Sequence, residues 1–334
     1  MILIDNQPIS FPDSSSQSQG KDILDILLEN PTLVSASNQF KSQPERIISD
    51  SGAHMKHVYV FQREFATVDP AVVQIVGTDE ATTCVGLVIR NKNNGLTSVS
   101  HMDFPEVVDR GLNQMVQSIN NPEAILDVFV VGGFDDSPNK NRRGRQTRKE
   151  GYSYPLCHKI IVSLLKRPEK FLLRLLFVLR HNTKSDSHGN QIPIFGGLLL
   201  ETSTGRVLPA CFENHARSPD EIVRRLLVSV SNDDLNLRGN LLDIYDTRRD
   251  IFTIPCVRWS MIWSELAYET AQVSDEEFLL QFSTSPFAEP PHFVQCQRRI
   301  GRYVIDHPDW RYTFPGGKPR VFQRNDDGTW FKCD

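Results

Sequence analysis

The alternation of apolar and polar residues predicts a chain rich in β-strands, and its clearest signal is a hairpin near residue 90. Residues 84–90 and 96–100 form two apolar runs, and residues 91–95 between them have the asparagine and glycine content of a tight turn. Further strands are predicted at residues 56–62, 71–76, 124–131, 171–180, 192–201 and 206–211. A second hairpin is expected at residues 241–246 and 250–255, and short strands are expected in the tail at residues 312–331.

Apolar residues at helical spacing predict fewer helices than strands. The strongest helix signal lies in residues 106–119, where the apolar side chains fall on one face. Shorter helices are predicted at residues 21–29, 156–165, 275–282 and 291–305. The first of these should end at Asn30-Pro31, and one more helix should begin at Ser218, whose hydroxyl can form a capping box with Glu221. Because helices are interspersed without strict alternation, we expect an α+β fold with largely antiparallel sheets.

The chain of 334 residues is long enough for one large domain or two ordinary ones. Residues 1–50 are expected to form an N-terminal extension with a loop and a short helix, and residues 51–334 a single domain. Residues 139–153 are basic and lack an apolar pattern, which predicts a loop insertion within that domain. Its basic side chains could form a nuclear-localisation or acidic-partner patch, although this composition is more typical of a solvated loop.

Composition and charge narrow the function classes further. The formal net charge is −4, so nothing favours nucleic acid or a membrane surface as a partner. No apolar run approaches the roughly 20 residues of a membrane helix, and the first residues lack the features of a signal peptide. The six cysteines are scattered, without a CxxC pair or metal-ligand spacing. We therefore expect a cytoplasmic or nuclear protein with free thiols.

The predicted hairpin brings one cysteine and one histidine to the same end. Cys84 follows a turn of small polar residues at the start of the first strand, and His101 lies at the end of the second. A thiol beside an imidazole is the minimal nucleophile and base for attacking an amide. Taken singly, each residue is more often structural, in a core or at a strand end, and only the pairing at loop-bordered strand ends favours catalysis.

Thr78 is the candidate third member of this site, and it precedes Cys84 within the same turn. A threonine oxygen can accept the hydrogen of imidazole Nδ1, which leaves Nε2 of His101 to face the thiol. The alternative is an ordinary turn threonine.

Three stretches of sequence carry a resemblance to a known family. They are residues 79–84 (DEATTC), 131–134 (VGGF) and 283–293 (STSPFAEPPHF). They resemble the protein N-terminal asparagine amidohydrolases, which deamidate an N-terminal Asn to Asp, and the resemblance spans about residues 50–334. The chain is identified as a eukaryotic, plant-like member of that family, from whose animal enzymes the basic residues 139–153 are a departure.

The Cys, His and Thr spacing is also similar to that of the bacterial chemotaxis-receptor glutamine deamidases. Thr78 lies six residues before Cys84, and His101 lies seventeen residues after it. The resemblance implies an α-β-β layered sandwich and a Cys-His-Thr amidase site, which needs no metal or organic cofactor. The resemblance to the N-terminal asparagine amidohydrolases further implies substrates with N-terminal Asn and action before arginylation in the N-degron pathway. It also makes arginyl-transferase components candidate partners.

An enzyme that acts on N-termini must recognise an α-ammonium group, which a buried carboxylate can bind through charge-assisted hydrogen bonds. Glu289 is the first candidate, because its neighbours are apolar and two prolines stiffen the backbone. The alternative for Glu289 is a structural carboxylate favoured by a helix N-terminus. Asp79 and Glu80 are further candidates, and Asp103 and Glu64 are weaker ones.

Two other functions stay open from the sequence. One is a broader deamidase for internal Gln or Asn of proteins, which an open groove would favour over an acidic pocket. The other is a non-catalytic adaptor that binds protein N-termini. The intact Cys84, His101 and Thr78 argue against an adaptor, since a pure binder has no use for the thiol.

Overall fold

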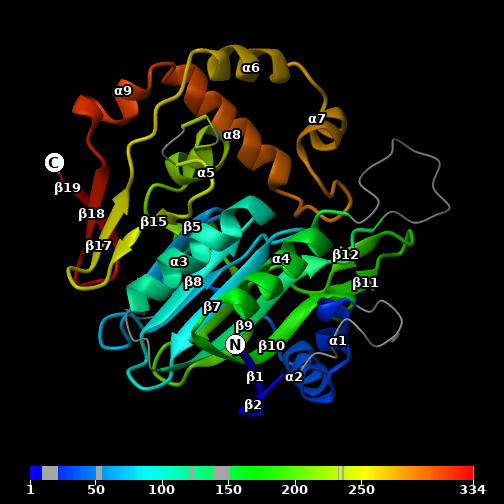
Figure 1. Ribbon diagram of the computed structural model, residues 1–334. Coiled ribbons are helices and arrows are strands. Elements are labelled where there is room, and N and C mark those ends of the chain that lie inside the picture. Colours follow the sequence, from blue (N-terminus) through cyan, green and yellow to red (C-terminus); the bar gives the residue numbers. More distant parts are fainter. Residues whose placement is uncertain are drawn as a thin grey trace.

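The computed structural model describes residues 1–9, 22–49, 55–119, 124–137, 151–231, 233–234 and 237–333. The basic insertion predicted at residues 139–153 lies outside these residues except for 151–153, where helix α4 (Ser153–Lys166) begins. The described residues mix helices and sheets in layers (Figure 1), which confirms the predicted α+β class.

An eight-stranded sheet lies at the centre of the molecule, with the strand order β15-β5-β8-β7-β9-β10-β1-β2. Its strands are β15 (Leu242–Asp243), β5 (Glu64–Val68), β8 (Thr97–Met102), β7 (Val85–Asn91), β9 (Ile125–Phe134), β10 (Lys170–Leu179), β1 (Ile2–Ile4) and β2 (Gln7–Pro8). The predicted hairpin is confirmed, because β7 and β8 pair in antiparallel register with Gly86 opposite His101. The central strands are covered on both faces, so their sequences are nearly continuous apolar runs.

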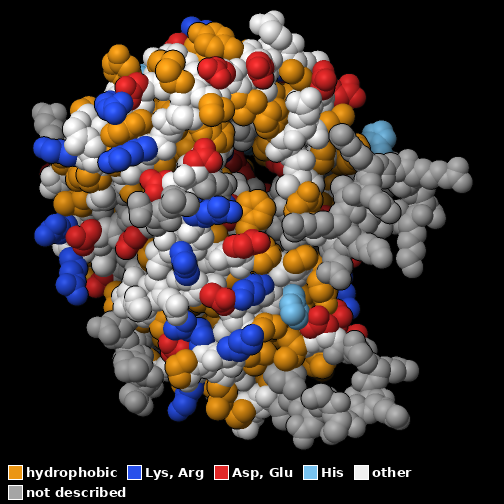
Figure 2. Space-filling model, turned by 45° about the horizontal axis from the view of Figure 1, so that its top comes forward, with side chains coloured by type: hydrophobic (Ala, Val, Ile, Leu, Met, Phe, Trp, Pro, Cys, Tyr) orange, Lys and Arg blue, Asp and Glu red, His pale blue; other side chains and the backbone are white. Residues whose placement is uncertain are grey.

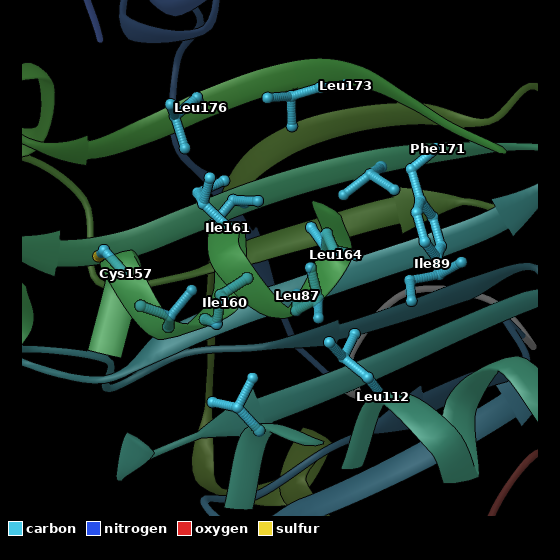
Figure 3. Close-up of a cluster of buried hydrophobic side chains, with 14 of the residues drawn as sticks. Leu87, Ile89, Leu112, Cys157, Ile160, Ile161, Leu164, Phe171, Leu173 and Leu176 are labelled. Carbon is cyan, nitrogen blue, oxygen red and sulfur yellow. The ribbon is translucent and has the colours of Figure 1, made fainter. Parts of the chain in front are cut away.

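Helices α3 (Val108–Ile119), α4 and α1 (Ile23–Glu29) cover one face of this sheet (Figure 1). The apolar face predicted in residues 106–119 is confirmed, because Leu112 and Met115 are fully buried. Figure 3 shows Leu112 of α3 and Ile160 of α4 in one cluster with Leu87 of β7. Each such aliphatic side chain contributes about 1.5–3 kcal/mol when it leaves water, which holds the helix layer on the sheet.

A five-stranded sheet packs on the opposite face, with the order β3-β14-β13-β6-β4. Its strands are β3 (Arg46–Ile48), β14 (Arg206–Phe212), β13 (Leu198–Glu201), β6 (Ile75–Thr78) and β4 (His57–Tyr59). Val76 and Leu198 of this sheet share a buried cluster with Val88 and Val99 of the central sheet. The layers are therefore helix, sheet and sheet, in agreement with the predicted α-β-β sandwich.

The C-terminal part of the chain adds helices at the top of Figure 1 and a small sheet at its left. The helices are α5 (Glu221–Val230), α6 (Ile262–Thr270), α7 (Asp275–Phe282), α8 (Phe293–Asp306) and α9 (Trp310–Thr313). The sheet consists of β16 (Tyr245–Asp246), β17 (Ile251–Ile254), β18 (Arg320–Arg324) and β19 (Trp330–Cys333). Elsewhere lie α2 (Pro31–Lys41), the pair β11 (Thr183–Ser185) and β12 (Gln191–Pro193), and the 3₁₀ helices η1 (Pro105–Val107), η2 (Arg180–Asn182), η3 (Asn214–Arg217) and η4 (Pro315–Gly317).

Two helix starts differ from the prediction. Helix α1 ends at Glu29, before Asn30-Pro31, as predicted. Helix α2, which begins at Pro31, was not predicted, and the Asn30 side chain accepts hydrogen bonds from the N–H groups of Thr32 and Leu33. A proline is tolerated at the first helical position, where its missing N–H has no partner in any case. The capping box at Ser218 was also wrong, since α5 begins at Glu221 and Asp220 takes the capping position.

Two further regions show where the apolar pattern was insufficient. Residues 192–201 form two strands, β12 and β13, in separate sheets instead of one strand. Strand β5 and helix α6 were not predicted, because their apolar patterns are short. The domain division at residue 50 stays a prediction, and we note that β1 and β3, which precede it, supply strands to the central and the second sheet respectively.

Candidate active site

Thr78, Cys84 and His101 come together where the two sheets meet. Thr78 ends β6, Cys84 directly precedes β7, and His101 lies in β8 opposite Gly86. A side chain at Gly86 would place its Cβ 2.9 Å from a Leu198 methyl carbon and 3.1 Å from the Thr78 methyl carbon. Glycine at position 86 therefore lets the strand with Thr78 approach the strand with His101.

The threonine orients the imidazole. Thr78 Oγ1 lies 2.7 Å from His101 Nδ1, and both side chains are buried. With Nδ1–H donating to the threonine oxygen, Nε2 carries the lone pair of a neutral imidazole. Nε2 is buried and has no hydrogen-bond partner among the described residues. An unpartnered buried nitrogen of this kind is unfavourable unless a thiol or a substrate uses it.

The backbone of Cys84 is fixed by the glycine pair that follows Val131. The N–H of Gly133 donates to the Cys84 carbonyl oxygen over 2.7 Å. Gly132 has a φ of 122°, and a Cβ there would lie 2.6 Å from the same oxygen. Because only glycine adopts this conformation without a clash, the stretch VGGF supports the turn that presents the cysteine.

Cys84 and His101 line one pocket, whose volume is about 290 Å³. Asp79, Glu80 and Glu289 line the same pocket, so three of the candidate carboxylates lie in the pocket that holds Cys84 and His101. Figure 2 shows a hollow in this face of the molecule with acidic side chains beside it. The walls come from the turn before β7 on one side and from α5, residues 282–293 and α8 on the other.

Burial keeps both reacting groups neutral. It raises the pKa of the Cys84 thiol well above its usual range, and the nearby carboxylates of Asp103 and Glu289 act in the same direction. Burial also lowers the pKa of His101 to about 4. The resting pair is therefore a thiol and a neutral imidazole at neutral pH, and the imidazole can accept a proton only as the sulfur attacks.

Asp79 is committed to the scaffold. The Tyr59 hydroxyl donates to its carboxylate over 2.6 Å, and the backbone N–H of Phe212 donates over 2.6 Å. Arg217 adds a buried ion pair with a distance of 3.0 Å. These three groups occupy the carboxylate, so Asp79 ties the turn before Cys84 to β4 and β14.

Glu80 is also neutralised, although its carboxylate lines the pocket. Arg217 lies 2.5 Å from it, Arg225 donates two hydrogen bonds over 2.7 and 3.0 Å, and His292 Nε2 lies 2.9 Å away. Burial opposes ionisation, yet the hydrogen bonds from His292 and Arg225 hold the pKa of Glu80 well below its usual range. Glu80 has a φ of 58°, a left-handed conformation that this network holds in place.

Glu289 differs from these carboxylates. Its Oε1 accepts hydrogen bonds from the hydroxyls of Ser283 over 2.5 Å and Ser285 over 3.4 Å. Among the described residues, no cation lies within ion-pair distance of it. Burial raises the pKa of Glu289. The carboxylate is thus held by neutral donors and lacks a countercharge.

The remaining two candidate carboxylates are each paired with a buried arginine. Asp103 lies 2.8 Å from the guanidinium of Arg63, and Glu64 lies 2.6 Å from that of Arg224. All four side chains are almost completely buried. Neither carboxylate has a free charge to offer an ammonium group.

The C-terminal segment 283–293 is fastened to the turn that carries Cys84. Thr284 Oγ1 lies 3.1 Å from Thr83 Oγ1, and His292 contacts Glu80. Two links along one short segment fix the position of Glu289 relative to the thiol. The sequence therefore builds the pocket from two stretches that are about 200 residues apart along the chain.

Several residues of the site had no sequence signal that could reveal them. Arg217 and Arg225 lie far along the chain from the turn that they neutralise, and only the helical spacing of Glu221 and Arg225 indicated an ion pair. Phe104 and Phe282 line the pocket from the ends of separate elements. Their roles depend on tertiary placement, which a periodicity cannot give.

Other site types find little support in the part of the chain that is described. No group of three His, Cys, Asp or Glu side chains among those residues is arranged to hold a metal ion. Each helix in the described ranges is too short or too polar to cross a membrane.

Comparison with known proteins gives one family throughout. The family model described as protein N-terminal asparagine amidohydrolase matches residues 48–332. The protein N-terminal asparagine amidohydrolase of Arabidopsis thaliana is 49% identical over 329 residues, which cover 96% of this chain and 95% of that protein. The proteins of the same name from Homo sapiens and Sus scrofa are 25% and 26% identical, over 99% and 98% of this chain and 97% and 96% of their own lengths. The higher identity to the plant protein confirms the plant-like assignment.

Proposed function

Since the chain belongs to the protein N-terminal asparagine amidohydrolase family, we propose that it deamidates the side chain of an N-terminal Asn with Cys84 as nucleophile. The observation that carries this proposal is the shared pocket. It is lined by the thiol of Cys84 and by the imidazole of His101, whose Nε2 is unpartnered, and by the carboxylate of Glu289, which lacks a countercharge. The first pair suits attack on an amide, and the carboxylate suits an α-ammonium group.

The first step transfers one proton and forms one bond. Nε2 of His101 accepts the thiol proton while the Cys84 sulfur attacks the side-chain amide carbon of the substrate. The low pKa of His101, about 4, supports a concerted transfer over a preformed thiolate. Thr78 keeps Nε2 directed at the sulfur by accepting the hydrogen of Nδ1. The amide oxygen becomes an oxyanion in the tetrahedral intermediate.

Backbone N–H groups beside the sulfur are suited to bind this oxyanion. The N–H groups of Thr83 and Cys84 have no acceptor among the described residues. His101 then protonates the departing nitrogen, so that the C–N bond breaks and ammonia leaves a thioester on Cys84. His101 next takes a proton from water, whose oxygen attacks the thioester carbon. The thioester C–S bond then breaks, His101 returns its proton to the departing sulfur, and the products are N-terminal Asp, the thiol and the neutral imidazole.

Glu289 gives the reaction its restriction to chain termini in this proposal. An α-ammonium group would supply the positive charge that Glu289 lacks, and the two serine hydroxyls would keep the carboxylate aimed at it. Asp79 and Glu80, which the sequence also nominates, act instead through the turn that holds Cys84. An internal Asn or Gln brings no ammonium group, so the uncompensated carboxylate favours N-terminal substrates over the broader deamidase.

The product of this reaction is a protein with a new acidic N-terminus. We propose that the enzyme acts before arginylation in the N-degron pathway, with arginyl-transferase components as partners. We also propose that it is located in the cytoplasm or the nucleus. The partnership would be tested by pull-down of an arginyl-transferase from plant extract with the immobilised wild-type protein. The control is the same surface without this protein. Transfer of labelled Arg to an Asn-peptide only after treatment with the enzyme would test the order of the reactions.

The proposed activity is tested by ammonia release from matched peptides that begin with Asn, Gln or acetylated Asn. The wild type should act on free N-terminal Asn alone, and Cys84→Ala should reduce turnover below detection. Cys84 makes few polar contacts, so the variant should unfold at the same temperature as the wild type. Turnover of acetylated Asn or Gln would favour the broader deamidase, and turnover by Cys84→Ala would contradict the thiol mechanism. Binding without any turnover by the wild type would favour the adaptor.

A further inference from the structure

Among the aromatic side chains that line the pocket, two are exposed and have no part in the mechanism. Phe104, which follows β8, and Phe282, the last residue of α7, both line the pocket. They remain 38% and 42% exposed. A single exposed aromatic residue is ordinary, but two that line the same pocket from different elements indicate a surface for binding an apolar group.

Both rings are supported from behind. Phe282 stacks on Phe278, with ring centroids 4.4 Å apart and an angle of 29° between the ring planes. The guanidinium of Arg63 lies 5.7 Å from the centroid of Phe104, and Asp103 holds that guanidinium in an ion pair. Rings that are already held in place lose little conformational entropy when a ligand packs on them.

The geometry of an N-terminal Asn shows what would reach these rings. Its α-carbon carries three non-hydrogen groups: the ammonium, the side chain and the backbone carbonyl. With the ammonium at Glu289 and the amide at Cys84, the carbonyl has to lead out of the pocket. The next residue lies only about 3.5 Å further along the chain, so its side chain is presented at the exposed rim.

Each ring belongs to a residue that lies close along the chain to one of the residues proposed to hold the Asn. Phe282 directly precedes Ser283, which holds Glu289, and Phe104 follows three residues after His101. We propose that Phe104 and Phe282 form a subsite for the side chain of the second residue of the substrate, and that it selects large apolar side chains. This inference rests on the proposed function, because Cys84 and Glu289 define where the first residue sits.

The chemistry of the rings sets the expected order of substrates. Aliphatic and aromatic side chains bury apolar area against ring faces and can stack on them. A glycine offers no side chain to bury. An acidic side chain would lose its hydration and meet the negative faces of the rings, so it should be the poorest.

The test uses four peptides that begin with Asn-Phe, Asn-Leu, Asn-Gly and Asn-Asp and are otherwise identical. The kcat/KM for ammonia release should be about tenfold higher with Phe or Leu than with Gly, and lowest with Asp. The double variant Phe104→Ala/Phe282→Ala should lower the Phe-to-Gly ratio to about twofold. Phe331→Ala is the matched control, since Phe331 lies on β19, is 43% exposed and should leave the ratio unchanged.

Each outcome decides a separate question. Equal kcat/KM for all four peptides would overturn the subsite and leave the proposed function standing. An unchanged ratio in the double variant would also overturn it, because the selectivity would then arise elsewhere. Failure of the wild type on every Asn peptide would overturn the proposed function and this inference with it. If circular dichroism shows that the double variant does not fold, Phe104→Leu and Phe282→Leu should each give an intermediate ratio.

Discussion

Two stretches bring acidic side chains to the same pocket, and they balance the charge in opposite ways. In the turn before Cys84, Asp79 and Glu80 are each paired with arginine. In the segment 283–293, Glu289 contacts two serine hydroxyls and no cation among the described residues. A partly buried carboxylate without a countercharge is unfavourable, and a cation that arrives with the substrate would relieve it.

The comparison distinguishes carboxylates that stabilise the fold from a carboxylate whose charge is left for a ligand. Arginine partners fix the turn and thereby the thiol, because each buried pair links strands and helices that are distant along the chain. Neutral donors fix the position of Glu289 without cancelling its charge. Polar pocket residues are therefore informative only when their partners are known, since Glu80 and Glu289 are the same residue type and line the same pocket.

The largest effect should come from Glu289→Gln. The variant removes the charge that pairs with the α-ammonium, and such a charged hydrogen bond contributes about 1.5–3 kcal/mol. We expect KM for an Asn peptide to rise between about tenfold and a hundredfold with little change in kcat. The melting temperature should stay the same or rise, because an uncompensated carboxylate is lost. An unchanged KM would reject the role of Glu289.

Glu80→Gln should show the reverse pattern. It removes one of the two carboxylate partners of Arg217 and of Arg225, which keep Asp79 and Glu221 respectively. Loss of hydrogen bonds to a charged group costs about 1.5–3 kcal/mol. We expect the free energy of unfolding in urea to fall by that amount. KM per folded molecule should change less than in Glu289→Gln. A variant that unfolds like the wild type but binds Asn peptides poorly would reverse the assignment of the two carboxylates.

Thr78→Val should have a smaller effect that is confined to the chemical step. It keeps the shape of the side chain and removes the hydroxyl that accepts from His101 Nδ1. Loss of one such hydrogen bond, about 1 kcal/mol, should lower kcat five- to tenfold and leave KM unchanged. Thr82→Val, at another threonine of the pocket, is the control. Equal losses of kcat in the two variants would argue against an orienting role for Thr78.

The smallest expected effect is a shift in the pH dependence of kcat/KM, which should differ between the wild type and Glu289→Gln. As pH falls, Glu289 loses its charge first because burial raises its pKa, and His101 follows only near its pKa of about 4. In wild type, the acid limb of kcat/KM should therefore report Glu289, and in Glu289→Gln it should move down toward pH 4. On the alkaline side, kcat/KM should fall near pH 8 as the substrate α-amine loses its proton. An acid limb that does not move would show that another group controls it.

The sequence predicted those parts of the molecule that depend on local pattern. The apolar runs around residues 91–95 correctly predicted the β7–β8 hairpin and so brought Cys84 near His101. Helix α7 has the predicted bounds, because Ser274 caps a strongly patterned segment. Thr78 was proposed from its place in the turn before Cys84, and the resemblance supported it and marked the segment with Glu289.

The charge balance of the pocket could not be predicted in this way. Arg225 reaches Glu80 from α5 across a separation of 145 residues, and no periodicity records such a contact. The proline at position 31 correctly marked the end of α1, but the start of α2 at the same residue was missed because the capping side chain of Asn30 was not considered. Local rules failed where a side chain from elsewhere decides the outcome, and the acidic pocket is built from such side chains.

The central claim is that Glu289 pairs with the α-ammonium of the substrate, and a thermodynamic cycle tests it most directly. Calorimetric binding would be measured in the Cys84→Ala background, with Glu or Gln at position 289 and with a free or an acetylated Asn peptide. The account predicts that Glu289→Gln weakens binding of the free peptide at least tenfold and leaves binding of the acetylated peptide unchanged. Equal losses for the two peptides would contradict it.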